Sequence, residues 1–379
     1  MENELINQRY NITLQVLTPM SIGAGAEYNW VKGIDYVEKN GKLFRLNLHK
    51  MEQAGINLEN LTNAFANKDS ESLLKYLGNG LDTVTDAVFN MPCNSSNDIK
   101  AFLRNQFTGN PIVAGSSLKG AIRSVLFSYL RDRQEKNEEV FGCLDNGTDF
   151  MRFIRVTDFE FDKTDLVNTK IYNLQKNGNH NWEGGWKHGA KITNYDYNAS
   201  GFNTIYECIT PPSKAKGSIM LSEKLFNLLK ESGSQQPCLN KKEELFSYIG
   251  KDEQGEYETT PIENLFYQIN SHTFDYLKKE LHFFNNYNQG EHSDRIIDSI
   301  NQLMNQVNEC IENGDSCILK MAAGTGYHSI TGDWKYDDYC DTGYWDQGWD
   351  KGKKKYKSRK IAIHGSQYTL MGFVKLTLQ

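Results

Sequence analysis

Residues 113–123 read VAGSSLKGAIR, and this stretch predicts the start of an amphipathic helix. The helix is expected to begin at Ser116 and Ser117, whose side-chain oxygens can accept hydrogen bonds from the unpaired amides of the first turn. Its apolar residues recur every three or four positions and therefore share one face: Leu118, Ile122, Val125 and Tyr129. The stretch thus predicts a helix that packs against a core and begins just after Gly115.

The N-terminus of this helix has the features of an anion-binding site. Unpaired amides and the helix dipole favour a negative charge there. Lys119 and Arg123 are four residues apart and share a face turned away from the apolar residues. Two interpretations stay open at this point: a cradle for backbone phosphate, or a capped helix with two solvated cations. NTP hydrolysis is disfavoured, because Ala121 and Ile122 follow Gly120 where a P-loop needs Lys and Ser or Thr.

The rest of the chain mixes strands and helices without a strict βαβ rhythm, which predicts the α+β class. Strands are expected at 12–17, 42–46, 153–156, 205–209, 217–221, 317–321, 360–363 and 373–376. Amphipathic helices are expected at 262–284 and 296–310, and 49–90 is expected to be helical and irregular. The segment 173–204 is crowded with Asn, Gly, His and Trp and is expected to be a long loop.

The charge balance excludes a protein that coats nucleic acid by bulk charge. The 379 residues contain 42 Lys and Arg against 48 Asp and Glu, a net charge of -6. The cations are concentrated, because the run 351–360 holds seven of them and no acid. This run follows six aspartates between Asp333 and Asp350, so contact with RNA and pairing with those aspartates are both open. A net charge of -6 is compatible with a protein that binds RNA through backbone amides and a few basic side chains.

The sequence indicates neither a membrane segment nor a cofactor. No signal peptide and no run of about 20 apolar residues is visible, so a soluble cytoplasmic protein is expected. The seven cysteines form no Cys-x-x-Cys pair, and no metal site is expected. The glycine loops at 23–25 and 324–326 lack the third glycine of a dinucleotide fingerprint, so no nucleotide cofactor is expected either.

Several motifs in order resemble the RAMP superfamily of CRISPR-associated proteins. VAGSSLKGAIR at 113–123 is similar to the family signature, which typically has Pro where Ala114 stands. TPMSIGAG at 18–25 resembles the first strand-to-loop motif, which often has His in place of Ser21. RVTD at 155–158 resembles the strand after the helix, and AGTGYH at 323–328 with Thr331 resembles the late glycine-rich loop. The ending MGFVKL at 371–376 is similar to one branch, the fifth Csm subunit of type III-A effector complexes.

This resemblance implies two ferredoxin-like (RRM-like) modules with helical and loop insertions. The modules are expected at 1–165, with the helical insertion 49–90, and at 205–379, with the long loop 166–204 between them. RNA would lie along the glycine loops and the helix N-terminus, with contacts mostly to phosphate and 2′-OH groups. The implied RNA-binding residues are Gly23, Gly25, Gly115, Ser116, Ser117, Lys119, Gly120, Arg123, Gly324, Gly326, His328, Lys353, Lys354 and Lys355.

The resemblance also implies the partners and leaves two functions to weigh. The expected role is a non-catalytic subunit that caps the 3′ end of the guide RNA (crRNA) and supports its maturation. The expected partners are the crRNA, a neighbouring RAMP backbone subunit and other Csm proteins, target RNA through guide pairing, and a trimming nuclease. The alternative is a backbone-type subunit that cuts target RNA with a metal ion at Asp35, a residue that 80 positions separate from Gly115.

Overall fold

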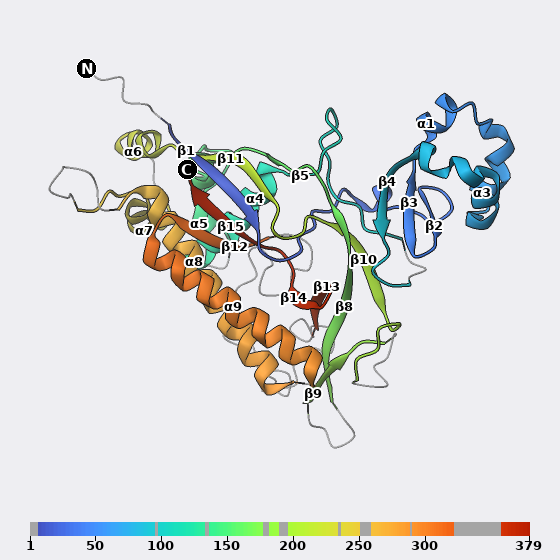
Figure 1. The fold of residues 1–379 in the computed structure, drawn as a ribbon. Helices are drawn as coiled ribbons and strands as arrows, with labels where there is room; N and C mark the ends of the chain where they lie inside the picture. Colours follow the sequence, from blue (N-terminus) through green and yellow to red (C-terminus); the bar gives the residue numbers. More distant parts are fainter. Residues whose placement is uncertain are drawn as a thin grey trace.

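The structure is a computed structural model in which the described residues are 7–94, 98–132, 136–176, 182–188, 196–233, 236–250, 259–288, 290–321 and 358–379. Two antiparallel sheets lie at its centre, long helices pack beside them, and a smaller three-stranded sheet stands to one side (Figure 1). This combination of helices with antiparallel sheets confirms the predicted α+β class.

The first sheet brings the two ends of the chain together. Its order is β12-β15-β1-β11-β6, and every neighbouring pair is antiparallel. The strands are β1 (Gln8–Val16), β6 (Ile154–Val156), β11 (Lys214–Leu221), β12 (Ser316–Lys320) and β15 (Phe373–Leu378). Because β1 pairs with β11 on one side and with β15 on the other, both halves of the chain form one sheet. The expected boundaries at 165 and 204 therefore do not separate the sheets.

Three helices pack against this sheet: α4 (Gly115–Leu130), α8 (Pro261–Asn286) and α9 (Glu291–Asn313). The predicted apolar face of α4 is confirmed, since Leu118, Ile122 and Val125 are buried in the main core. The two long helices are also confirmed and lie side by side in Figure 1. α8 begins at a capping box in which the Thr260 amide donates to Glu263 Oε2 at 2.7 Å.

The second sheet corrects the prediction of a long loop at 173–204. Its order is β10-β8-β13-β14, with β9 paired to β8, and its strands are β8 (Asp165–Lys176), β9 (Trp182–Trp186), β10 (Asn203–Cys208), β13 (Ser358–His364) and β14 (Gln367–Leu370). The loop prediction is wrong for the end of β8, for β9 and for the start of β10. Contacts between aromatic residues far apart in sequence stabilise these strands. The ring centres of Trp186 and Tyr172 are 5.2 Å apart, and those of Tyr172 and Phe284 of α8 are 5.3 Å apart.

The segment 36–90 forms a side unit with a core of its own (Figure 1). It contains β2 (Tyr36–Lys39), β3 (Lys42–Leu46) and β4 (Thr85–Asn90), with α1 (Leu48–Gln53), η2 (Leu58–Leu61), α2 (Thr62–Ala66), α3 (Ser70–Leu77) and η3 (Gly78–Val84) between β3 and β4. The helical prediction for 49–90 is confirmed as far as Val84 and is wrong for β4. Asn40 and Gly41, both with positive φ, make the β2–β3 turn that this dipeptide predicts.

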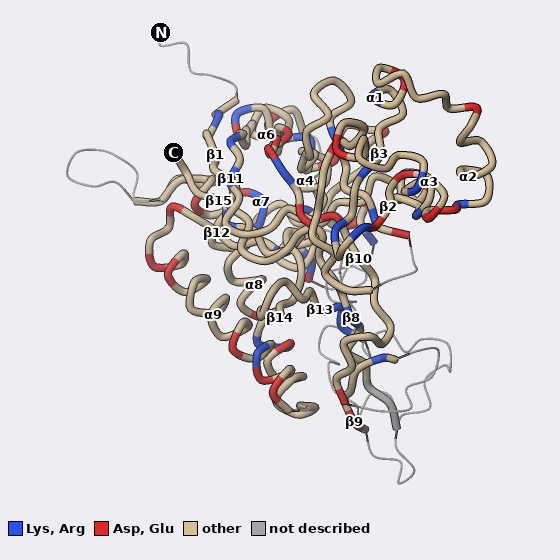
Figure 2. The backbone as a smooth tube through the Cα atoms, turned by 45° about the vertical axis from the view of Figure 1, so that its right-hand side comes forward, with Lys and Arg blue, Asp and Glu red and all other residues tan. Residues whose placement is uncertain are grey.

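The remaining elements are short and connect these layers. They are η1 (Ala26–Tyr28), β5 (Ile112–Val113), α5 (Asn137–Phe141), η4 (Phe150–Phe153), β7 (Phe159–Glu160), α6 (Glu223–Glu231) and α7 (Leu239–Leu245). Acidic residues recur along α9, while basic residues lie around β8 and β13 (Figure 2). Across the described ranges, none of the helices is long and apolar enough to cross a membrane.

Candidate nucleic-acid interface

The N-terminus of α4 is built against the strand that follows it. A side chain at Gly115 would place its Cβ 2.2 Å from the carbonyl oxygen of Val156, so this position requires glycine. The Gly115 amide donates to Asp158 Oδ1 at 2.7 Å. Asp158 therefore satisfies an amide that the helix cannot satisfy itself, and it places a carboxylate at the positive end of the helix dipole.

This arrangement corrects the expected cap of the helix. α4 begins at Gly115 with Ala114 at the N-cap, and no side chain caps it at that position. The Ser117 amide bonds to the Ala114 carbonyl at 2.9 Å, so two amides of the first turn already have partners within the protein. Ser116 is exposed and Ser117 is half-buried, and both lie in the first turn, after the cap. The helix N-terminus consequently offers fewer free amides to a phosphate than the sequence indicates.

The two predicted cations of α4 have different environments. Arg123 Nη1 lies 3.2 Å from Asp149 Oδ2, and its guanidinium stacks at 4.1 Å over the Phe141 ring. Lys119 is half-buried, and its side chain has no hydrogen bond or ion pair among the described residues. Burial lowers its pKa, Asp149 opposes that shift, and the nearby charges of Arg123 and Arg155 lower the pKa further. Lys119 and the exposed Arg155 of β6 are therefore the cations of this region that can meet an added phosphate.

The first glycine loop lies against another part of the chain. Gly23 bridges to Phe102, the Ala24 amide donates to the Ala101 carbonyl at 3.2 Å, and Gly25 has φ +119°. The loop then leads into η1. The two predicted RNA-binding elements thus contact different segments of the chain. The glycine loop contacts residues 101–103, and the start of α4 contacts residues 156–158.

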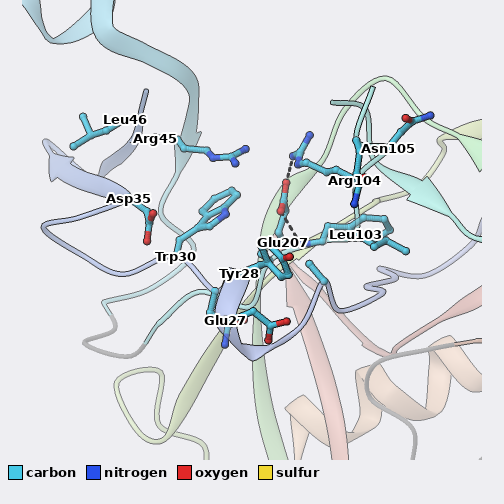
Figure 3. Close-up of a pocket in the computed structure, with 15 residues that line it drawn as sticks. Glu27, Tyr28, Trp30, Asp35, Arg45, Leu46, Leu103, Arg104, Asn105 and Glu207 are labelled. Carbon is cyan, nitrogen blue, oxygen red and sulfur yellow. Dashed lines mark hydrogen bonds and ion pairs between the residues drawn. The ribbon is translucent and has the colours of Figure 1, made fainter. Parts of the chain in front are cut away.

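A cavity of about 550 Å³ opens between this glycine loop, the side unit and the segment 101–106. Tyr28, Trp30, Arg45 and Arg104 are among its lining residues, and the two guanidinium groups face each other across it (Figure 3). The Arg45 guanidinium carbon lies 4.7 Å from the centre of the Trp30 ring. None of these four side chains was predicted as a site residue. They come from an η-helix, two loops and a strand, and no motif marks them in the sequence.

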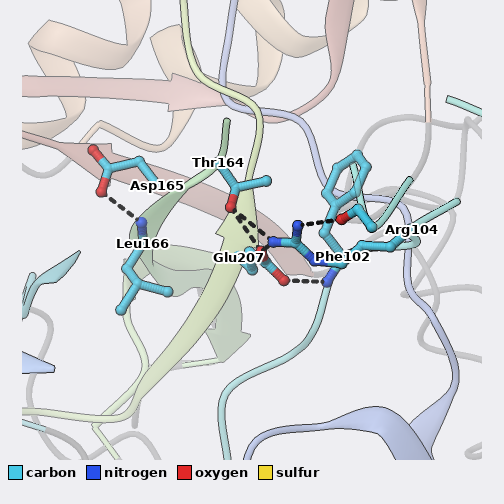
Figure 4. A network of polar contacts seen from close by, with 7 residues as sticks. Phe102, Arg104, Thr164, Asp165, Leu166 and Glu207 are labelled. Carbon is cyan, nitrogen blue, oxygen red and sulfur yellow. Dashed lines mark hydrogen bonds and ion pairs between the residues drawn. The ribbon is translucent and has the colours of Figure 1, made fainter. Parts of the chain in front are cut away.

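A buried network fixes Arg104 at the edge of the cavity (Figure 4). Glu207 is fully buried, pairs with Arg104, and accepts hydrogen bonds from the Phe102 amide at 2.8 Å and from Thr164 Oγ1 at 2.6 Å. Arg104 Nη1 also donates to the Gly109 carbonyl at 2.9 Å. These contacts leave the buried carboxylate with three partners and tie the loop after Arg104 to the second sheet.

Asp35 lines the same cavity and has a local structural partner. The Val31 amide donates to Asp35 Oδ2 at 2.7 Å, and the Asp35 amide donates back to the Val31 carbonyl at 2.8 Å. These bonds close the turn that leads into β2. No cluster of three or more His, Cys, Asp or Glu side chains able to hold a metal ion occurs among the described residues.

The remaining site predictions fall on other parts of the chain. Gly120 lies in the second turn of α4, and a Cβ there would meet nothing within 4 Å. Outside the described residues lie Gly324, Gly326, His328, Lys353, Lys354 and Lys355.

The comparison with protein families identifies the chain. The model of the RAMP superfamily matches residues 13–308, which is more than half of the 379 residues. The chain belongs to the RAMP superfamily. No curated protein sequence matches it.

Two solved structures are similar to this RAMP protein over nearly its whole length. One is a chain of the cryo-EM structure of a Csm-crRNA-target RNA ternary complex of a type III-A CRISPR-Cas system, with a TM-score of 0.62 and 17% identity. That match covers 98% of this chain and 100% of the other. The other is the crystal structure of T. onnurineus Csm5, with a TM-score of 0.58 and 14% identity, covering 96% of this chain and 99% of that one. The RAMP fold is thus shared from end to end.

Proposed function

We propose that this RAMP protein is a non-catalytic crRNA-binding subunit of a type III-A Csm effector complex, which caps the 3′ end of the crRNA. One observation carries the proposal: the fold matches T. onnurineus Csm5 over 96% of this chain and 99% of that one. A match of this extent includes the side unit and the long helices as well as the motif-bearing sheet. The resemblance of the MGFVKL ending to the same branch agrees with it.

The strand arrangement supports a ferredoxin-like module in the first sheet. Four of its strands have the order β15-β1-β11-β6, which is the 4-1-3-2 order of a βαββαβ unit with α4 and α8 as the connecting helices. β12 adds an edge strand beside β15. The second module that the resemblance implies remains a prediction.

Lys119 and Arg155 are the proposed backbone contacts of the motif-bearing region. They lie on α4 and β6, beside the glycine segment that resembles the family signature. Neighbouring Csm subunits and target RNA paired to the guide are the proposed partners, and α9, with five acids against one Arg, offers an acidic face for protein contact. A trimming nuclease is a further proposed partner.

The complex itself provides the test. A tagged chain is expressed with the other subunits of its complex, and the RNA that co-purifies is sequenced. Short repeat-derived RNA is expected, and its absence would contradict the proposal. Lys119→Glu with Arg155→Glu is expected to lower the RNA yield, whereas Lys42→Glu with Lys75→Glu, two exposed lysines of the side unit, makes the same charge change and is expected to leave it unaltered.

The catalytic alternative is tested on Asp35. Its hydrogen bond from the Val31 amide supports a structural role. Asp35→Asn keeps an oxygen that can accept this bond and removes the charge that a metal ion needs. Cleavage of target RNA by the assembled complex is expected to be unchanged. Loss of cleavage with a normal yield of bound RNA would establish the alternative.

A further inference from the structure

We propose that the cavity between η1, β3 and the segment 101–106 binds a single nucleotide of unpaired RNA, with its phosphate between Arg45 and Arg104 and its base against Tyr28. The proposal rests on the proposed function in one respect, namely that RNA is the ligand. The cavity volume of about 550 Å³ is in the range of small-ligand clefts.

The two arginines provide the phosphate site. Arg45 is half-buried, and its side chain has no hydrogen bond or ion pair among the described residues, although the guanidinium carries five donors. Arg104 uses Nη1 and Nη2 on Gly109, Thr164 and Glu207. Burial and then the like charge of Arg104 lower the pKa of Arg45, while Glu207, Asp86 and Asp35 oppose this shift. An anion held between the two guanidinium groups in Figure 3 removes this conflict.

The acids of the cavity determine which way a nucleotide lies. Glu207 forms an ion pair with Arg104, whereas Asp35 accepts a hydrogen bond from the Val31 amide and has no ion pair among the described residues. Glu27 is exposed and lies beside Tyr28, away from the guanidinium groups (Figure 3). Its charge repels a phosphate from that end, and the phosphate is therefore expected at the arginines.

The aromatic residues divide into a contact residue and a positioning residue. Trp30 is 3% exposed, packs on Phe89 at 5.6 Å, and presents its ring to Arg45, so it positions that cation. Tyr28 is 62% exposed and stacks on no other ring among the described residues, which leaves its ring for a base. Base–aromatic stacking accepts any of the four bases, so the site is expected to bind without strong sequence preference.

Binding of a fluorescein-labelled, single-stranded RNA 12-mer to the full chain tests both halves of the site. Tyr28→Ala is expected to weaken binding at least about fivefold, and Arg45→Gln about tenfold. Only Arg45→Gln is expected to reduce the slope of log K against log salt, by about 0.7 for one lost phosphate contact. Matched controls are Tyr267→Ala, an exposed tyrosine of α8, and Arg295→Gln, which pairs with Glu291 on α9. Both controls are expected to bind like the unaltered chain.

The outcomes separate this inference from the proposed function. Thermal unfolding confirms that each variant is folded, and exposed Tyr28 can be altered without loss of core packing. Equal affinity and equal salt slope for Tyr28→Ala, Arg45→Gln and the controls would overturn the nucleotide site. Repeat-derived RNA would still co-purify with the complex in that case, and the proposed function would stand. An ultraviolet cross-link from RNA to Tyr28 supports the site, and the sequence of the cross-linked RNA identifies it as guide or target.

Discussion

At the scale of single residues, two close contacts of Gly115 determine how the signature motif at 113–123 is packed. The sequence predicts a special role for Gly115, and the structure gives the reason: the backbone of Val156 lies where a side chain would stand. The Gly115 amide donates its hydrogen bond to the carboxylate of Asp158, which lies 43 positions further along the chain. Spacing within 113–123 could not reveal this partner, because the contact depends on how β6 returns to the helix.

Gly115→Ala and Gly120→Ala are expected to change stability in opposite directions. The first places a Cβ 2.2 Å from a backbone oxygen, and the required shift should lower the free energy of unfolding by roughly 2 kcal/mol. The second places a Cβ in open space within a helix, which should raise it by about 0.5–1 kcal/mol. Urea unfolding of the two variants measures both changes. Equal effects would show that the close approach at Gly115 is absent in solution.

Two buried lysines predict a rise of stability with pH. Burial lowers the pKa of Lys170 and of Lys242 to about 8, below the ordinary value of 10.5. Between these values the unfolded chain binds more protons than the folded chain, so the free energy of unfolding increases as pH rises from 8. Below pH 8 both states are protonated, and this contribution has no slope.

Lys242→Met tests this pH dependence. The side chain is fully buried, its Nζ lies 3.4 Å from the Phe141 carbonyl, and methionine fills a similar volume without a charge. The variant is expected to be more stable than the original chain at pH 7 and to show a smaller rise between pH 8 and 9.5. Urea unfolding at a series of pH values gives both quantities. An unchanged slope would mean that Lys242 keeps its ordinary pKa in the folded protein.

At the scale of elements, the periodicity of apolar residues predicted the buried face of a helix better than it predicted where the helix begins. The apolar spacing of α4 correctly identified its buried face, because that face depends only on residues within the helix. Its start was misplaced by about one residue, because Asp158 binds the first amide and no serine side chain caps the N-terminus. β9 was missed for a related reason: its residues show no alternation, and Trp186 is buried by Tyr172 and Tyr197 from outside the strand.

Asp158→Ala is expected to destabilise the start of α4. It removes the acceptor of the Gly115 amide and the carboxylate at the helix N-terminus, a loss of about 1 kcal/mol in the free energy of unfolding. Asp162→Ala is the control, because Asp162 is exposed four residues further on and forms no hydrogen bond among the described residues. Hydrogen exchange of amides 115–118 should rise in the first variant alone. Equal protection in both variants would exclude Asp158 as the cap.

At the scale of the whole molecule, the C-terminal strand is an internal part of the first sheet. β15 lies between β1 and β12, so its residues close a sheet that began more than 350 positions earlier. Leu376, in the middle of β15, is fully buried in the core that also contains the α4 face. The integrity of the predicted RNA-binding region therefore depends on the last residues of the chain.

Leu376→Ala tests this dependence. The cavity left by the leucine should lower the free energy of unfolding by roughly 2–4 kcal/mol in a single transition. Thr377→Ala, the next residue on the opposite face of β15, is half-buried and should cost no more than about 0.5 kcal/mol. Fluorescence and circular dichroism followed in the same urea titration measure both. Two separate transitions in the Leu376→Ala chain would show that β15 is not integral to the core.

The sequence by itself determined the class of the fold, most strands and helices, the buried face of α4 and the superfamily. These properties depend on residues close together in the chain, where periodicity and motif spacing are visible. Only the tertiary structure decided that both halves of the chain share a sheet and that Asp158 accepts the hydrogen bond of the first amide of α4. It also decided that Arg45 faces Arg104 across a cavity beside Trp30 and Tyr28. Each of these results requires segments that are distant in sequence to be brought together by core packing, and no local pattern records such an approach.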